Sequence, residues 1–339
     1  MYNNKTTFLL LGALLLAAFV LQLTVGSVFV SANELLQLFT GDTQNQIVTN
    51  IVFGSRLPSA IAALVSGAAL AVSGLMMQTM FRNPVAGPYV LGISSGAMLG
   101  VALLVLGAGA MGIREIYGIG AMALVFAAAT GALTVFLFTF FVSLYMRSVV
   151  AMLIIGLMIG GAISAVVEVL QSLSGSDALK SYLMWTFGSF RYVNNSQVLY
   201  LSAIVCAALI GAFFLCKSLN LLLLGDVYAE SSGLSIRKTK IQIIILTSLL
   251  AGTVTSFCGP IGFVGLAVPH IARKIFGTAN HQTLVPACML IGAIVCGVAN
   301  VVAVLPGSDK ILPLNAIMNI LSAPVVIWII LQQRKQQSW

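Results

Sequence analysis

Few side chains in this sequence have the types and spacing that acid–base, metal or nucleotide chemistry requires. The five cysteines stand without a Cys-x-x-Cys pair, and the two histidines, His270 and His281, are too few for a histidine-based metal site. The chain also lacks a Gly-x-x-x-x-Gly-Lys-[Ser/Thr] segment, so it cannot hold ATP in a P-loop. We therefore expect no catalytic residue, no metal site and no cofactor in this chain, and we do not expect an enzyme.

Glu168, in the fifth apolar run, is the one ionisable residue of the sequence that lies clearly inside such a run. An acid within a membrane segment often marks a route for ions or substrate. The alternative is a carboxylate at the wet end of a helix, and Glu168 fits this alternative because it lies close to one end of its run. A lone acid argues against an ion-coupled transporter, which usually carries several ionisable groups inside its spans.

Residues 259–273 are apolar enough to lie in a bilayer, yet Pro260, Gly262, Gly265 and Pro269 interrupt helical regularity. Unpaired backbone groups in hydrocarbon cost several kcal/mol each, roughly, so such a segment survives only where protein or a water-filled cavity covers it. Broken helices at membrane depth are typical of transporters. The alternative is a kinked helix that only packs, because Gly and Pro are common in membrane helices.

Residues 224–236 predict a short helix in a loop between two apolar runs. Gly225 suits a turn, Asp226 is a candidate N-cap, and Gly233 stands where a glycine commonly ends a helix. About one and a half helical turns fit between them. Such a helix either docks a cytoplasmic motor protein or lies as a surface loop at the lipid headgroups.

The elements that must position these residues are membrane-spanning helices. The chain has 339 residues, of which 60% are hydrophobic and 7% charged, whereas about a quarter are charged in a soluble domain. Gly92, Gly96 and Gly100 also have the four-residue spacing of close helix contacts in lipid. We predict an all-α, polytopic membrane protein forming one domain over residues 1–339. Runs of about 20 apolar residues give about ten spans, at 7–30, 59–81, 89–107, 119–146, 149–171, 196–216, 241–258, 260–273, 283–304 and 313–332.

The charge distribution orients these spans. The net charge of +8 comes from basic residues scattered between apolar runs, which argues against nucleic-acid binding and for membrane topology. With both termini in the cytoplasm, 11 of the 16 basic residues fall inside: Lys5, Arg82, Arg147, Lys217, Arg237, Lys238, Lys240, Arg273, Lys274, Arg334 and Lys335. The other five fall outside: Arg56, Arg114, Lys180, Arg191 and Lys310. This asymmetry follows the positive-inside rule.

Several motifs together resemble the FecCD family of ABC importer permeases. They are Arg56-Leu-Pro-Ser59, Gly67 to Gly74 with Gln78, residues 82–97, residues 224–236, Trp185 with Gly188-Ser189, and residues 259–273 with Gly277 and His281. The resemblance runs from about residue 50 to the C-terminus. It implies a type II permease of about ten helices in the cytoplasmic (inner) membrane, which pairs with a second copy, two cytoplasmic ATPase subunits and an extracytoplasmic substrate-binding protein. ATP and Mg²⁺ then belong to the ATPase subunits.

The resemblance also implies a cargo and residue roles. Family members carry iron–siderophore chelates, haem or vitamin B12. We expect an iron(III) chelate, with vitamin B12 or haem as the alternative and an ion-coupled secondary transporter as the more distant one. The expected gate and pathway residues are Asn83, Pro84, Val85 and Glu168, and Arg56 is the expected docking residue for the binding protein. The expected ATPase contacts are Leu224, Gly225, Asp226, Tyr228, Ala229, Glu230, Gly233 and Leu234.

The chain departs from the family pattern at its outer face. Vitamin B12 permeases carry an arginine after Leu-Pro where this chain has Ser59, and Asp-x-x-Ala-Arg where it has Asn300 and Val304. This chain therefore keeps Arg56 alone of the set that pairs with carboxylates of the binding protein. Lys310 and Arg114 are the candidates to replace the missing charges.

Overall fold

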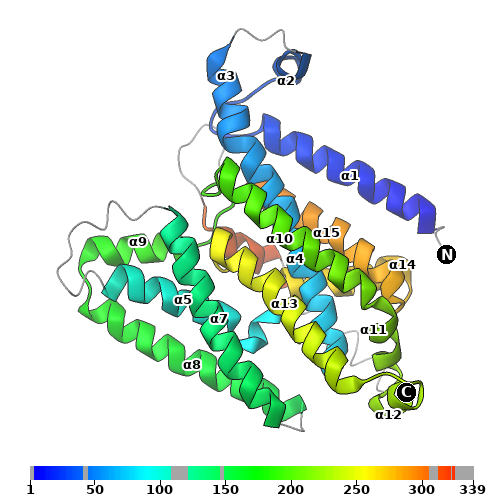
Figure 1. Ribbon diagram of the computed structural model, residues 1–339. Helices are drawn as coiled ribbons and strands as arrows, with labels where there is room; N and C mark the ends of the chain where they lie inside the picture. The colour runs from blue at the N-terminus through cyan, green and yellow to red at the C-terminus, as the bar shows by residue number, and fades with distance from the viewer. Residues whose placement is uncertain are drawn as a thin grey trace.

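The computed structural model describes residues 4–40, 45–107, 121–145, 149–304, 312–321 and 323–324, and all regular structure among them is helical. Figure 1 shows the arrangement. The helices are α1 (Asn4–Thr24), α2 (Ala32–Thr40), α3 (Gln46–Ile51), η1 (Val52–Arg56), α4 (Leu57–Phe81), η2 (Pro88–Leu91), α5 (Ile93–Ala102), η3 (Leu103–Gly107), α7 (Ala121–Tyr145), α8 (Val149–Leu173), α9 (Ser176–Thr186), α10 (Asn195–Phe214), α11 (Cys216–Leu223), α12 (Asp226–Ser231), α13 (Ile236–Cys258), α14 (Val264–Phe276) and α15 (His281–Val302).

Nine of the ten predicted spans correspond to helices of this set, with some boundaries moved, and residues 314–321 of the tenth are helical. In the described part of the chain, seven helices are long and apolar enough to cross a membrane, Ile93–Gly107 is a shorter apolar helix, and α14 has 13 residues. The second span does not begin at residue 59, because the helix is continuous over Gln46–Phe81. The first ends at Thr24, not at residue 30. Outside the described residues lie Arg114, Arg147, Lys310, Arg334, Lys335 and residues 325–332 of the last predicted span.

Helix α4 is the centre of the fold. It is buried along almost its whole length and packs against α10, α13, α14 and α15. Glycines let the neighbouring backbones come close: Gly67 lies against Gly292 of α15, and Gly74 against Gly265 of α14. Helices α5, α7 and α8 form a second group, which joins the first through contacts of α13 with α5 and α7 (Figure 1). The elements at the two ends of α4 are therefore held by a rigid central helix.

The predicted break in residues 259–273 is narrower than the sequence suggested. The backbone leaves the helix only between Gly259, with φ +75°, and Phe263, with φ +64°, whereas Gly265 and Pro269 lie inside α14. The Cys258 carbonyl accepts from the Ser189 amide at 2.8 Å. The Gly262 amide donates to the Asn315 side chain at 3.1 Å. Neighbouring segments thus satisfy backbone groups that the break releases, as a membrane interior requires.

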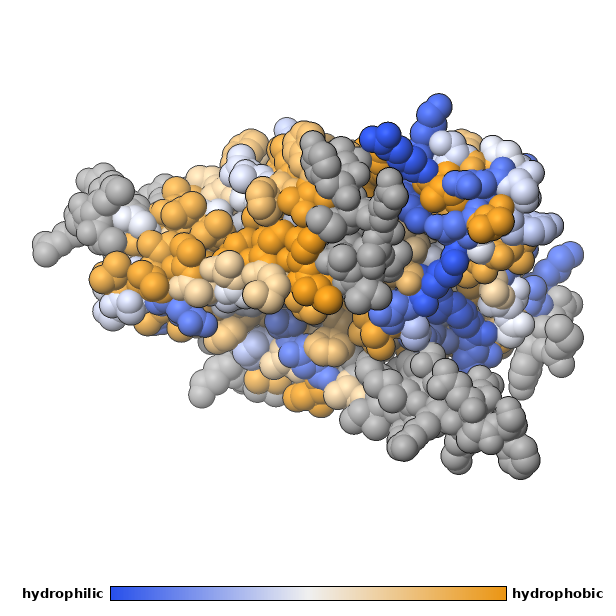
Figure 2. All heavy atoms as spheres, turned by 90° about the horizontal axis from the view of Figure 1, so that it is seen from below, coloured by the Kyte–Doolittle hydropathy of each residue, from blue (hydrophilic) through white to orange (hydrophobic). Residues whose placement is uncertain are grey.

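Two ends of the molecule can be told apart by their contacts and charges. Figure 2 views the molecule from the end that carries α12, where hydrophilic residues gather on the side of α11 and α12 and apolar residues cover the side of α7 and α8. Phe8 of α1 stacks near Phe276 at the end of α14, with ring centroids 4.7 Å apart. At the other end, Gln22 of α1 meets Asn300 of α15. The start of α1 therefore lies nearer the α12 end than its last turn does.

Candidate coupling and gate site

Helix α12 forms from local backbone signals at both of its ends. Gly225 precedes it with φ +112°, a conformation that favours glycine, and serves as the N-cap residue. The predicted N-cap role of Asp226 is wrong, because Asp226 is the first helical residue and its side chain makes ion pairs instead. The predicted glycine stop is confirmed. The Gly233 amide donates to the Glu230 carbonyl at 2.9 Å and the Leu234 amide to the Ala229 carbonyl at 3.0 Å, a Schellman motif.

The two faces of α12 differ in what they offer a partner. Val227 is 84% exposed, and Leu224 and Tyr228 are also exposed. Ala229, an expected ATPase contact, is 0% exposed and faces the core, so this expectation does not fit the structure. Val227 was not among the expected ATPase contacts, because a six-residue helix has too few turns to show which face is exposed. The outward face therefore carries an apolar patch of Leu224, Val227 and Tyr228, which we call the α12 patch.

The expected gate residues form a tight turn directly after α4. Arg82 ends the helix in the left-handed conformation, with φ +46°. The Asn83 side-chain oxygen accepts from the Val85 amide at 3.0 Å, and the Ala86 amide donates to the Asn83 carbonyl at 3.1 Å. Pro84 is anchored from α14, because His270 Nε2 donates to its carbonyl at 2.8 Å. We call residues 82–87 the gate turn; the Val85 side chain projects from it, exposed.

The gate turn is joined directly to α12. The Arg82 guanidinium contacts one oxygen of the Asp226 carboxylate, and Lys240 Nζ of α13 lies 2.9 Å from the other. Arg82 Nε also donates to the Leu222 carbonyl of α11 at 3.2 Å. In the sequence, Arg82 stood out as an inside charge and as the start of a family motif, and Lys240 as an inside charge. Their meeting at Asp226 could not be found from residues so far apart along the chain.

Polar contacts fix the ends of α4, α14 and α15 beside the gate turn. Arg273 donates to the Gln78 side-chain oxygen at 2.7 Å, and Gln78 donates to the Leu266 carbonyl at 3.1 Å. His281 Nδ1 donates to the Asn220 side-chain oxygen at 2.7 Å and its other ring nitrogen lies 2.8 Å from the Thr79 hydroxyl. Both histidines of the chain are therefore used in hydrogen bonds between segments, His270 to the gate turn and His281 to α4 and α11.

Glu168 is not part of this arrangement. It is exposed on α8, near the helix end at which the Ser174 hydroxyl donates to the Leu106 carbonyl of η3 at 3.3 Å. The gate turn leads into η2, at the opposite end of α5 and η3. The structure thus brings Asn83, Pro84 and Val85 together and leaves Glu168 apart from them.

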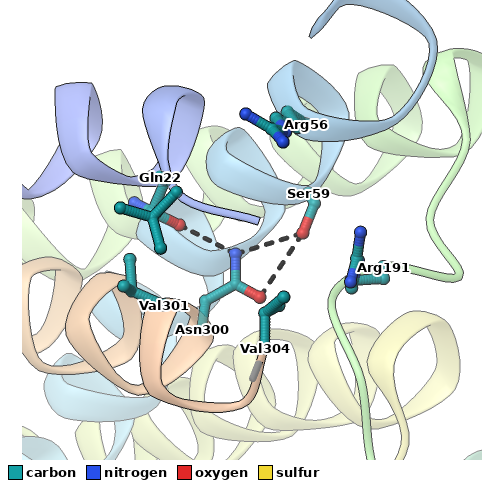
Figure 3. Close-up of a pocket in the computed structure, with 8 residues that line it drawn as sticks. Gln22, Arg56, Ser59, Arg191, Asn300, Val301 and Val304 are labelled. Carbon is teal, nitrogen blue, oxygen red and sulfur yellow. Dashed lines mark hydrogen bonds between the residues drawn. The ribbon is translucent and has the colours of Figure 1, made fainter. Parts of the chain in front are cut away.

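Arg56 lies at the opposite end of α4 and is 6% exposed. Its guanidinium donates to the Leu23 carbonyl at 2.6 Å and the Thr24 carbonyl at 2.9 Å, and also contacts the Val28 carbonyl. Figure 3 shows it above the neighbouring hollow. The expectation of an outward-facing docking residue therefore does not fit this structure, because Arg56 satisfies carbonyls released where α1 ends.

The hollow beside α1 is lined by two arginines, Arg56 and Arg191, together with neutral side chains. Asn300 Nδ2 donates to the Gln22 side-chain oxygen at 2.9 Å and to the Ser59 hydroxyl at 3.1 Å, and all three residues are buried (Figure 3). Ser59 and Asn300 are two of the three positions at which the family resemblance indicated a departure from vitamin B12 permeases. A hydrogen-bonded network of uncharged groups thus ties α1, α4 and α15 together. The hollow is also lined by Val304 and Arg191.

The fold and these two ends define a class of protein. The chain is a multi-pass helical protein with a broken span. It has a turn that is held between two helices and a short helix in a loop between spans. These are features of a membrane transporter subunit. The model of the FecCD transport family matches residues 14–332, and the chain belongs to this family. The membership decides against the ion-coupled secondary transporter.

Several known proteins are similar to this chain over nearly its whole length. The hemin transport system permease HmuU of Yersinia pestis is 34% identical over 97% of both chains. The vitamin B12 import permease BtuC of Citrobacter koseri is 33% identical over 96% of this chain and 94% of its own. The molybdate import permease MolB of Haemophilus influenzae is 32% identical over 92% and 91%. A solved ABC transporter assigned to the metal-chelate type, in an inward-facing conformation, has a TM-score of 0.84 at 27% identity and covers 97% of this chain and 99% of its own.

Proposed function

We propose that this chain is the permease subunit of an ATP-driven importer that moves an iron(III) chelate across the cytoplasmic membrane by alternating access. The observation that carries the proposal is the α12 patch, an exposed apolar surface on a helix whose first residue is ion-paired to the gate turn. A motor protein that binds this patch could move the gate turn. The proposal fits a family of permeases that leave ATP hydrolysis to a separate subunit.

The proposed complex contains two copies of this chain, two ATPase subunits at the α12 end and a substrate-binding protein at the Arg56 end. The α12 end is assigned to the cytoplasm because Arg82, Lys240 and Arg273 meet there, together with other basic residues of α11, α13 and α14. The start of α1 is then cytoplasmic, and we propose the same side for the C-terminus. The cargo is proposed from the family and from the likeness to a metal-chelate transporter. Haem and vitamin B12 remain the alternatives, supported by HmuU and BtuC.

Val227→Asp tests the role of the α12 patch. A carboxylate placed in an apolar interface loses its hydration without gaining a partner, so the variant should bind the ATPase at least about tenfold more weakly and should lose uptake. Folding should be unaffected, because Val227 is exposed in the single chain. The measurements are co-purification with the ATPase, thermal unfolding of the subunit alone, and uptake. Val227→Ile is the matched control and should behave as the parent.

The cargo is tested with the unmodified complex in proteoliposomes that contain its binding protein. An iron(III)–siderophore complex, haemin, cobalamin and molybdate are offered with and without ATP. ATP-dependent uptake of the siderophore complex is expected. Uptake of one of the other compounds alone would replace the proposed cargo, and no ATP-dependent uptake of any of them would contradict the proposed function. If Val227→Asp leaves both the ATPase affinity and the uptake unchanged, the α12 patch does not bind the ATPase and carries no part of the proposed function.

A further inference from the structure

Asp226 stands where two parts of the molecule meet. It is the first residue of α12, and its two carboxylate oxygens are divided between partners: Oδ1 contacts Arg82 and Oδ2 lies 2.9 Å from Lys240 Nζ. Arg82 belongs to the end of α4 and Lys240 to the first turns of α13. The carboxylate therefore connects α12 to both helices at once.

Arg82 extends this connection into the gate turn. It is the residue directly before Asn83, and its backbone is left-handed, a conformation that a non-glycine residue adopts only where its surroundings hold it. Its side chain reaches α11 through the Leu222 carbonyl and α12 through Asp226. A shift of Asp226 therefore pulls on the residue whose backbone sets the direction of the gate turn.

The opposite side of the gate turn is fixed independently. His270 of α14 donates to the Pro84 carbonyl at 2.8 Å, and Arg273 of the same helix donates to Gln78 in the last turn of α4 at 2.7 Å. The gate turn is thus held between α12 on one side and α14 on the other. When α12 moves relative to α14, either the Arg82–Asp226 pair opens or the gate turn follows α12.

We propose that the Arg82–Asp226 ion pair, reinforced by Lys240, is the link through which a displacement of α12 moves the gate turn. This rests on the proposed function, in which the ATPase displaces α12. Arg82, Asp226 and Lys240 act as positioning residues and do not touch the cargo. The side chains of Arg82 and Asp226 are 46% and 44% exposed, so the pair adds little to folding stability. Its loss should therefore affect coupling far more than folding.

The test uses the full complex in proteoliposomes with Asp226→Asn, Arg82→Gln and the double variant that combines these two substitutions. Both single variants should keep the thermal unfolding temperature and the ATPase affinity of the parent. Uptake per ATP hydrolysed should fall about tenfold, within the 5–150-fold typical of coupling between sites. The double variant should lose little more coupling than either single variant, because both substitutions remove the same interaction, and a double-mutant cycle isolates that interaction. Lys238→Gln, which removes a charge from the same end of α13, is the control and should leave coupling unchanged.

A second readout follows the gate turn itself. All five cysteines lie in the described part of the chain as free thiols, and of these Cys206 is exposed while the other four are buried. Removing it with Cys206→Ser and adding Val85→Cys leaves the exposed reporter thiol on the gate turn. Its reaction rate with a water-soluble maleimide should change on ATP binding in the parent and should not change in Asp226→Asn. Unchanged coupling in both single variants would overturn the link, as would a double variant whose loss equals the two single losses combined. Loss of ATPase affinity in Asp226→Asn would make Asp226 a direct contact and overturn it too. If the parent complex itself shows no ATP-dependent uptake, the proposed function fails instead.

Discussion

Gly74→Ala is expected to prevent this subunit from folding into a stable form. A Cβ atom at position 74 would lie 1.8 Å from the carbonyl oxygen of Gly265 and 2.3 Å from its carbonyl carbon. These are backbone atoms close to the start of α14, so the clash cannot be relieved by a side-chain rotation. Overpacking a core typically costs about 1–3 kcal/mol, and a backbone clash at the centre of the fold should cost at least about 3 kcal/mol. The measurement is the yield of monodisperse protein in detergent and its unfolding temperature.

Gly12→Ala is the matched control for this substitution. Gly12 also lies within a membrane helix, α1, but a Cβ atom there would meet nothing within 4 Å. Alanine is the better helix former by about 1 kcal/mol in water, so this variant should be as stable as the parent or slightly more stable. Equal yields and unfolding temperatures for the two variants would show that α4 and α14 separate easily, contrary to the packing described above.

Close helix contacts could be predicted from the sequence only in part. The four-residue spacing of Gly92, Gly96 and Gly100 indicated one, and Gly96 and Gly100 do lie against α7, where Gly131 and Ala127 face them. Such a glycine spacing identifies one of the two helices in a close contact but does not identify the helix that packs against it. Gly74 and Gly265 are far apart along the chain, and no local pattern connects them. The family resemblance brought both motifs into view, but it gave no contact between them.

The spans were largely predictable because hydropathy decides which segments enter a membrane. The errors fall where a helix continues through polar residues. Helix α3 with η1 was missed because Asn50, Ser55 and Arg56 lower the hydropathy of a segment that is nevertheless continuous with α4. Helices α2, α9 and α11 were missed because they are shorter than a span and lie in the connections between apolar runs.

The candidate site was predictable in its backbone and not in its contacts. Gly225 and Gly233 bound α12 through their own conformational freedom, which is a local property of the chain. Which side of α12 faces the core is not local, since a six-residue helix has too few turns to show a periodic face. The sequence therefore did not show that Ala229 is buried and that Val227 is exposed.

Arg56→Gln is expected to destabilise the subunit by about 3 kcal/mol, because hydrogen bonds to a charged group contribute about 1.5–3 kcal/mol each and buried acceptors would be left unpaired. The Leu23 and Thr24 carbonyls, at the end of α1, would lose their donor. Such a loss should lower the unfolding temperature by about 5–10 °C. Arg56→Lys should recover only part of it, since an ammonium group lacks the planar fork that reaches several carbonyls. Thermal unfolding in detergent measures both effects.

Gly26→Ala separates this internal role of Arg56 from a docking role. A Cβ atom at position 26 would lie 2.5 Å from Arg56 Nη2, so alanine should displace the guanidinium while leaving its charge in place. If Arg56 holds the end of α1, Gly26→Ala should lower the unfolding temperature in the same direction as Arg56→Gln. The affinity of the folded subunit for its binding protein should then change little in either variant. If Arg56→Gln weakens binding-protein affinity at low salt and leaves stability intact, Arg56 is a docking residue and the buried contacts described above do not hold in the assembled importer.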